Sequence, residues 1–147
     1  MNFADSLVEG KRSEQIILSM IHSKYPNAFI KKGYHKEYDI MIPEINKTIE
    51  VKKDFKSQYT GNIVIEIEMN NKKSALSTTT ADWWVIHTDN CTLFWISPKD
   101  INKIIEKENF KPVEFIGKGD TISKIAYLIP KEYFFKYATH QRINKGI

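Results

Sequence analysis

The chain is poor in the residues that mark disulfide-rich, zinc-binding and membrane-spanning proteins. It has one cysteine, Cys91, in 147 residues. A single cysteine excludes an intrachain disulfide and a zinc site made of clustered cysteines, so we expect a cytoplasmic protein. No apolar run approaches the roughly 20 residues that a membrane span requires, and we find no basic and then apolar leader segment. We therefore expect no association with membranes.

Glycine and proline are scarce as well, with six and five residues, and 41% of the chain is hydrophobic. A chain of this composition, without repeats or low-complexity segments, has enough apolar side chains for a sizeable core. We expect one globular domain that spans residues 1–147.

The most informative pattern is Glu50-Val51-Lys52, which follows Asp39 by eleven positions. An acidic residue, any residue and then Lys also occur at residues 9–11 and 54–56, so the triplet alone carries little information. Its setting distinguishes it. The triplet lies in a run rich in β-branched residues, and a second strand-like run that carries a carboxylate precedes this run.

The two runs are predicted to form a hairpin. In the second run side chains alternate between faces, so Glu50 and Lys52 project together. The turn at residues 43–47 folds this run back on the first, and a hairpin register can bring Asp39 beside Glu50. Two carboxylates and a lysine in this arrangement indicate a divalent-metal site; the alternative is a solvated strand face with opposite charges.

A third carboxylate lies on an amphipathic helix predicted for residues 3–25. Glu14 falls on the apolar stripe of this helix, seven residues after Leu7 and seven before Ile21. A buried carboxylate is costly unless it is paired, metal-bound or protonated. Glu14 therefore joins the candidate site; the alternative is a helix-edge pair with Lys11 or Lys24.

With these residues the chain resembles the PD-(D/E)xK nucleases, a superfamily that includes restriction enzymes, junction resolvases and phage nucleases. The resemblance covers about residues 3–97, and Tyr38 stands where the motif has Pro. The segments at residues 60–68 and 77–85 are similar to a small phage-type subgroup. The fold that the resemblance implies is α/β, with a restriction-endonuclease-like mixed β-sheet flanked by helices.

The resemblance also implies roles for the site residues and a cofactor. Asp39, Glu50 and the Val51 carbonyl would be ligands of Mg²⁺, for which Mn²⁺ can substitute, and Lys52 would be the catalytic lysine. Glu14 matches a helical glutamate that some branches add, either as a metal ligand or as a residue that orients the ligands. Mg²⁺ prefers hard oxygen ligands and keeps several waters, which leaves positions for a phosphate oxygen and a nucleophile. Whether Lys52 acts on the attacking water or on the phosphate is left open.

Charge is distributed unevenly along the chain. The formal net charge is +4, and residues 99–147 contain ten Lys or Arg against six Asp or Glu, so the excess lies in this C-terminal third. Beside a phosphodiesterase-like site, this basic third indicates contacts with nucleic-acid phosphates; otherwise it is solvated surface. The candidate nucleic-acid-binding residues are Lys118, Lys124, Lys131, Lys136 and Arg142.

The remaining chain is predicted to be scaffold. Residues 62–69 alternate as a strand that we expect to pair with the Glu50 strand, which would let Glu66 reach the site; the alternative is an acidic surface ladder. We expect a hairpin of residues 83–87 and 92–96 and a helix capped by Ser97. A strand pair at residues 113–116 and 122–129 and a mobile basic tail would complete the chain.

We therefore expect a Mg²⁺-dependent DNA endonuclease that cuts by attack of water on phosphorus and leaves a 5′-phosphate. A homodimer is expected because cutting two strands requires two sites or two visits. Three alternatives stay open: a resolvase of branched DNA, a sequence-specific restriction or homing enzyme, and a nucleic-acid-binding protein that performs no chemistry. The sequence does not distinguish DNA from RNA.

Overall fold

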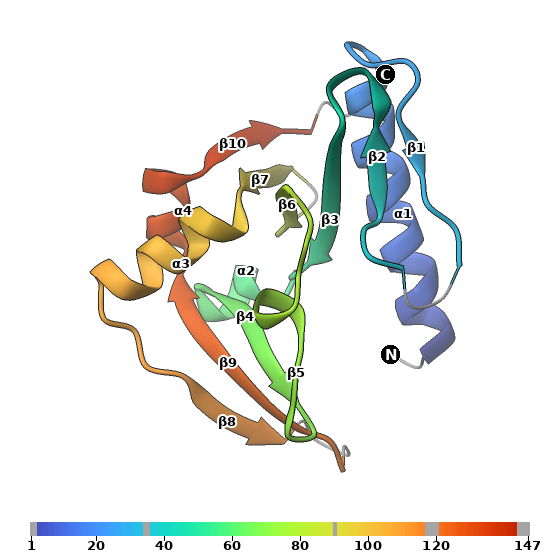
Figure 1. Ribbon diagram of the computed structural model, residues 1–147. Helices are drawn as coiled ribbons and strands as arrows, with labels where there is room; N and C mark the ends of the chain where they lie inside the picture. Colours follow the sequence, from blue (N-terminus) through green and yellow to red (C-terminus); the bar gives the residue numbers. More distant parts are fainter. Residues whose placement is uncertain (1–2, 34–35, 90, 117–120, 144–147) are drawn as a thin grey trace.

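The computed structural model describes residues 3–33, 36–89, 91–116 and 121–143, with side chains from Gly10 onward. It contains two β-sheets and four α-helices (Figure 1). The predicted α/β class with a mixed sheet is therefore confirmed, whereas the restriction-endonuclease-like core stays a prediction. None of the described helices is long and apolar enough to cross a membrane.

Sheet A has six strands in the order β1-β2-β3-β6-β7-β10. These strands are β1 (Phe29–Ile30), β2 (Ile40–Ile42), β3 (Lys47–Lys53), β6 (Trp83–His87), β7 (Thr92–Ile96) and β10 (Thr139–Arg142). Neighbouring strands are antiparallel except β3 and β6, which are parallel. The two central strands β3 and β6 thus come from distant parts of the sequence.

Sheet B is antiparallel, with the order β5-β4-β9-β8. Its strands are β4 (Asn62–Met69), β5 (Lys72–Lys73), β8 (Val113–Ile116) and β9 (Ser123–Pro130). The α-helices are α1 (Phe3–His22), α2 (Ser57–Thr60), α3 (Pro98–Lys107) and α4 (Lys131–Tyr137), and short 3₁₀ helices are η1 (Pro43–Ile45) and η2 (Ala75–Ser77). In Figure 1, α1 lies beside β1 and β2, whereas α3 and α4 lie on the side of sheet B.

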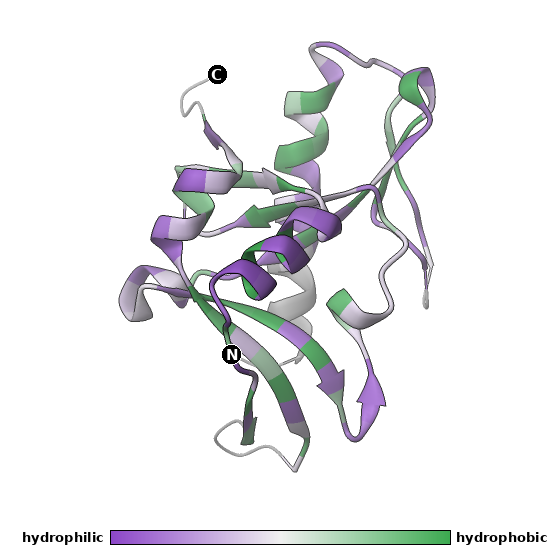
Figure 2. Cartoon of the chain, turned by 60° about the vertical axis from the view of Figure 1, so that its left-hand side comes forward, coloured by the Kyte–Doolittle hydropathy of each residue, from purple (hydrophilic) through white to green (hydrophobic). Residues whose placement is uncertain are grey.

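The core has two parts because side chains alternate between the two faces of sheet A. Figure 2 marks the hydrophobic and hydrophilic residues along the chain in green and purple. On one face Ile17 and Ile21 of α1 pack with Ile49 and Val85. On the other face a larger cluster joins β6 and β7 to sheet B, α3 and α4; its largest fully buried side chains are Trp84, Phe94 and Phe134. Sheet A is therefore covered on both faces.

The predicted hairpin of the candidate site is confirmed. The strands β2 and β3 pair antiparallel with Ile40 opposite Ile49. Pro43 starts the 3₁₀ turn η1 between them, and Asn46 ends it in the left-handed region at φ 51°. Asparagine tolerates this conformation better than most residues, so the chain can reverse here.

The predicted partner of the strand at residues 62–69 is wrong. This strand, β4, pairs with β9 in sheet B. The edge of β3 that β4 was expected to take is occupied by β6. The short helix α2 and Gly61, at φ 76°, redirect the chain after β3. The Asp54 carboxylate then accepts a hydrogen bond from the N–H of Val64 at 2.8 Å, which ties β4 to the segment that follows β3.

Residues 131–142 are also more ordered than predicted. Instead of forming a mobile tail, residues 131–137 form α4 and residues 139–142 form β10, which pairs with β7. The other scaffold predictions are confirmed: β6 and β7 form a hairpin, β8 pairs with β9, and the side chain of Ser97 caps α3.

Candidate active site

Asp39 lies at the start of β2, where the hairpin register places it next to Glu50. Its backbone N–H donates to the Ile49 carbonyl at 2.9 Å, and its Oδ2 accepts the N–H of Val51 at 2.7 Å. Asp39 is only 6% exposed. A backbone donor thus holds this buried carboxylate, and burial, which would raise its pKa, is outweighed by the hydrogen bonds from Val51 and Lys36, so the pKa of Asp39 is lowered.

Lys36 joins Asp39 to Glu14. Its Nζ lies 3.0 Å from Asp39 Oδ1, 3.1 Å from Glu14 Oε1 and 3.4 Å from the carbonyl oxygen of Lys31. Burial lowers the pKa of Lys36, but the bonds to Asp39 and Glu14 outweigh it and the pKa is raised. Lys36 is therefore a charged counter-ion that two of the predicted site carboxylates share.

Glu14 reaches the site from α1, as the helical stripe predicts. Next to it, Ser13 Oγ lies 2.8 Å from His87 Nδ1, and both residues are buried, so this contact ties α1 to β6. The ion pair of Glu14 is with Lys36, not with Lys11 or Lys24. Burial and its contact with Asp39 raise the pKa of Glu14.

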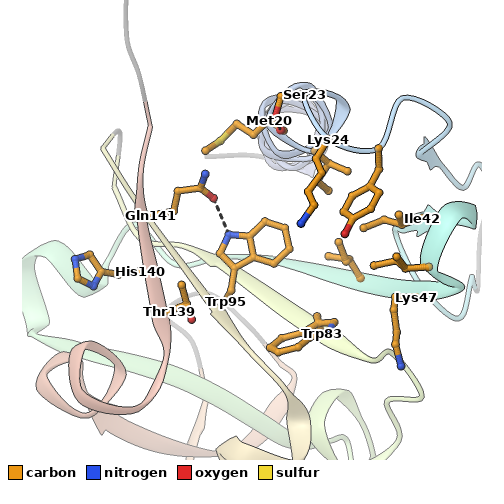
Figure 3. Close-up of a pocket in the computed structure, with 14 residues that line it drawn as sticks. Met20, Ser23, Lys24, Ile42, Lys47, Trp83, Trp95, Thr139, His140 and Gln141 are labelled. Atoms are coloured by element: carbon orange, nitrogen blue, oxygen red, sulfur yellow. Dashed lines mark hydrogen bonds between the residues drawn. The ribbon is translucent and has the colours of Figure 1, made fainter.

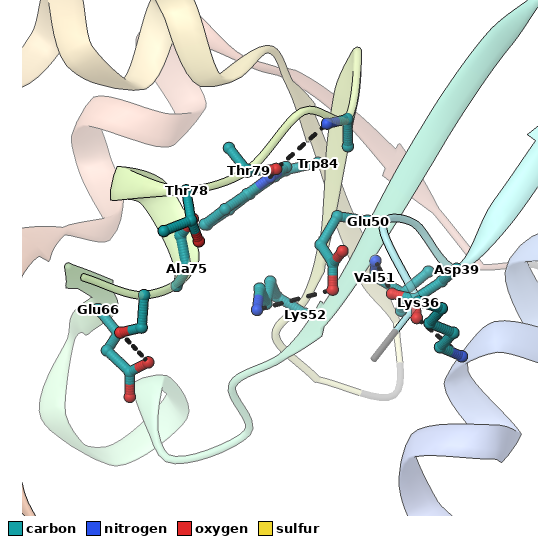
Figure 4. A network of polar contacts seen from close by, with 12 residues as sticks. Lys36, Asp39, Glu50, Val51, Lys52, Glu66, Ala75, Thr78, Thr79 and Trp84 are labelled. Atoms are coloured by element: carbon teal, nitrogen blue, oxygen red, sulfur yellow. Dashed lines mark hydrogen bonds and ion pairs between the residues drawn. The ribbon is translucent and has the colours of Figure 1, made fainter. Parts of the chain in front are cut away.

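Glu50 and Lys52 project from the same face of β3, as the alternation predicts (Figure 4). Lys52 Nζ is 3.7 Å from Glu50 Oε1 and 5.1 Å from the centre of the Trp84 ring. Burial raises the pKa of Glu50 to about 7; the charge of Lys52 opposes this and that of Asp39 reinforces it. Glu50 is thus a carboxyl group whose charge is not fully compensated.

A polar cavity of about 560 Å³ opens beside these two residues. Glu50, Lys52, Lys36 and Trp84 line it together with residues 78–80, three threonines. The indole of Trp84 is held in place because its Nε1 donates to Thr79 Oγ1 at 3.1 Å. The cavity therefore gives a polar substrate access to Glu50 and to Lys52.

Glu66 takes no direct part in this arrangement. Its Oε2 accepts a hydrogen bond from Ser74 Oγ at 2.8 Å, and Figure 4 shows it well away from Glu50. Because β4 pairs with β9 in sheet B, Glu66 does not reach the site through pairing of β4 with β3.

The donor chemistry of Asp39, Glu50 and Val51 fits a hard divalent cation. The two carboxyl groups interact directly, and the Val51 carbonyl lies on the same side of β3 as the N–H that Asp39 binds. A cation there would supply the positive counter-charge that Glu50 lacks. In the described part of the chain, however, no three His, Cys, Asp or Glu side chains converge as a metal cluster.

Sequence reasoning did not assign Lys36 to the site. The residue lies three positions before Asp39, outside any regular element. A periodic pattern therefore could not reveal it; the available signal was a lysine next to a buried acidic residue.

The four described members of the predicted nucleic-acid-binding set lie on three different elements. Lys124 lines a cleft beside the site. Lys131 lies at the start of α4, with its Nζ 3.9 Å from Asp89 Oδ2. Lys136 lies further along α4, and Arg142 lies on the edge strand β10. The strands β6 and β7 separate β10 from β3. Lys118 lies outside the described residues. Their contact with nucleic acid stays a prediction.

A further cavity, of about 630 Å³, lies between the end of α1 and sheet A (Figure 3). Trp83 and Trp95 line it, and Trp95 Nε1 donates to Gln141 Oε1 at 3.0 Å. Among the described residues that line it there is no Asp or Glu. It therefore lacks the carboxylates that the chemistry of the first site requires.

Comparison of the chain with protein-family models, curated proteins and solved structures finds no match.

Proposed function

We propose that this chain is a metal-dependent nuclease of the PD-(D/E)xK type that hydrolyses phosphodiester bonds in DNA. The observation that carries the proposal is that a backbone N–H fixes Asp39 beside Glu50, with Lys52 on the same cavity wall as Glu50. A metal-activated hydrolase needs carboxylates at one point and a cation next to the reacting phosphate, and this combination supplies both.

Each side chain has a role that its position allows. Asp39, Glu50 and the Val51 carbonyl would hold Mg²⁺, which when bound neutralises phosphate charge and makes a water molecule more acidic. Lys52 extends into the cavity, where its ammonium group orients the attacking water or binds a phosphate oxygen. Lys36 keeps Glu14 and Asp39 in place by pairing with both.

The direct test is a cleavage assay with the purified protein and Mg²⁺ on supercoiled, linear, single-stranded and branched DNA and on RNA. We expect cleavage by the wild type and none by Asp39→Asn, which keeps the shape of the side chain but removes its charge. Asp100→Asn on α3 is the matched control, because Asp100 is a half-exposed carboxylate that pairs with Lys103, away from the site. Cleavage by Asp39→Asn at the wild-type rate would remove the proposed site.

One observation favours a second candidate, a nucleic-acid-binding protein without catalytic activity. Lys36 already places a positive charge between Glu14 and Asp39, which would make a metal unnecessary for charge balance. Calorimetry with Ca²⁺ separates the two candidates. A nuclease binds the ion and loses this binding in Asp39→Asn, whereas a protein whose carboxylates are satisfied by lysine binds none.

A further inference from the structure

A second cleft, of about 420 Å³, opens where the end of β3 faces sheet B. Lys52 and Trp84 line both this cleft and the polar cavity at Glu50, so the two are adjacent. The near wall of the cleft includes the end of β3, and its far wall comes from β4, β8 and β9.

The charge of this cleft favours an anionic ligand. Four lysines line it: Lys52, Lys53, Lys56 and Lys124. It also contains two carboxylates, but each already accepts a hydrogen bond from within the protein, Asp54 from the Val64 N–H and Glu66 from Ser74 Oγ, both at 2.8 Å. The lysines outnumber these acids, and the cleft that they line reaches from Lys52, beside Glu50, to β9 of sheet B. A chain of phosphates could follow them.

An aromatic ring lies at the far end of the cleft. Phe115 of β8 pairs in register with Lys124 of β9, so both side chains are on the same face of sheet B. Phe115 is 36% exposed, so part of its side chain is open to a ligand. An ammonium group beside an open aromatic face is the combination that binds an unpaired nucleotide, through its phosphate and its base.

We propose that this cleft binds a single nucleic-acid strand that extends from the active site, with a base stacked on Phe115 and phosphates on Lys56 and Lys124. The volume of the cleft falls in the range of about 300–1,000 Å³ that is typical of pockets for small ligands, and it suits one or two nucleotides better than a base-paired duplex. The inference rests on the proposed function, because it assigns to that site substrates with an unpaired strand or arm.

The test is fluorescence anisotropy with labelled single-stranded DNA, blunt duplex and duplex with a single-stranded arm, in Ca²⁺ so that binding is measured without cleavage. We expect Phe115→Ala to weaken binding of the single strand and of the armed duplex by about fivefold or more, the loss typical of one base stack, and to leave the blunt duplex unchanged. Phe115→Leu keeps an apolar side chain without a ring and should show the same loss, which guards against an effect of folding.

Lys124→Ala should weaken binding of the single strand and reduce its log-log salt slope by about 0.7, the value for one phosphate contact. The matched controls are Phe29→Ala on β1, whose ring is 46% exposed, and Lys103→Ala on α3, which lie outside this cleft. Both controls should bind like the wild type.

The outcomes separate the two proposals. If the wild type binds no nucleic acid, both are wrong. If it binds and cleaves but the Phe115 and Lys124 variants behave like the controls, the cleft is not the binding site while the nuclease stands. If the variants lose duplex and single-strand affinity equally, the assignment to an unpaired strand is wrong.

Discussion

Replacing Glu50 by glutamine should stabilise the metal-free protein at alkaline pH and leave its stability unchanged at acid pH. Burial is the main reason that the pKa of Glu50 is raised, with the charge of Asp39 as a further cause. The ionised form is therefore disfavoured in the folded state. Glutamine has nearly the same size and cannot ionise, so Glu50→Gln removes this cost without leaving a cavity.

The magnitude follows from the difference between the two pKa values. The pKa of Glu50 rises from 4.5 to about 7 on folding, and one unit corresponds to about 1.4 kcal/mol, so full ionisation costs about 3 kcal/mol. Below pH 4.5 the group is protonated in both states and the cost is absent. As the pH rises from 4.5 through about 7, the carboxyl ionises more readily in the unfolded state than in the folded state. The folded wild type therefore loses up to about 3 kcal/mol of stability over this range.

The assay is urea denaturation of wild type and Glu50→Gln in EDTA at pH 4.5, 7 and 8.5. The difference in free energy of unfolding should grow from near zero to about 3 kcal/mol in favour of the variant. Glu106→Gln, an exposed carboxyl on α3, is the control and should show no such trend. A difference between Glu50→Gln and wild type that does not change with pH would refute the reasoning.

Three other substitutions test the remaining charges of the site. Lys52→Ala should retain Ca²⁺ binding by calorimetry but lose most of the cleavage rate, since its ammonium acts on water or phosphate; normal cleavage would make the triplet a chance match. Glu14→Gln should lower activity at limiting Mg²⁺ and be partly rescued by Mn²⁺, and superimposable metal titrations would place Glu14 outside the site. Lys36→Met should lower the free energy of unfolding in EDTA by about 1–3 kcal/mol, because two carboxylates lose their shared counter-ion, and should tighten Ca²⁺ binding. Weaker Ca²⁺ binding would show that Lys36 supports the cation and does not compete with it.

The hairpin at the site was predictable because its signals are local. Alternation along β3 and the turn at Pro43 determine which side chains share a face and where the chain reverses. The same holds for Glu14, whose helical stripe indicates the side that meets the sheet. These predictions required only neighbours in sequence.

Strand partners and ion pairs were not predictable in the same way. Alternation shows that β4 is a strand but not which edge it joins, and β6 reaches β3 from a segment thirty residues further along. Lys36 belongs to no periodic element, so only the folded chain reveals that its ammonium lies between Glu14 and Asp39. The cleft on sheet B was missed because its position depends on the partner of β4, which alternation does not reveal.

The charges of the site predict how a cation should affect substrate binding. Three carboxylates, Glu14, Asp39 and Glu50, meet two ammonium groups, Lys36 and Lys52, so the fully ionised site carries a net charge of −1. A phosphodiester brought there adds another negative charge and is repelled, whereas a divalent cation offsets both.

Affinity for a blunt duplex should therefore rise when Ca²⁺ replaces EDTA at pH 8.5. The loss caused by Phe115→Ala on an armed duplex should be the same in both conditions, because the cleft has its own lysines and no need of the cation. Anisotropy titrations of wild type and Phe115→Ala, with and without Ca²⁺, measure the two effects separately. Duplex affinity that is indifferent to Ca²⁺ would mean that the scissile phosphate does not approach Asp39 and Glu50, and the site would have to be sought elsewhere on the protein.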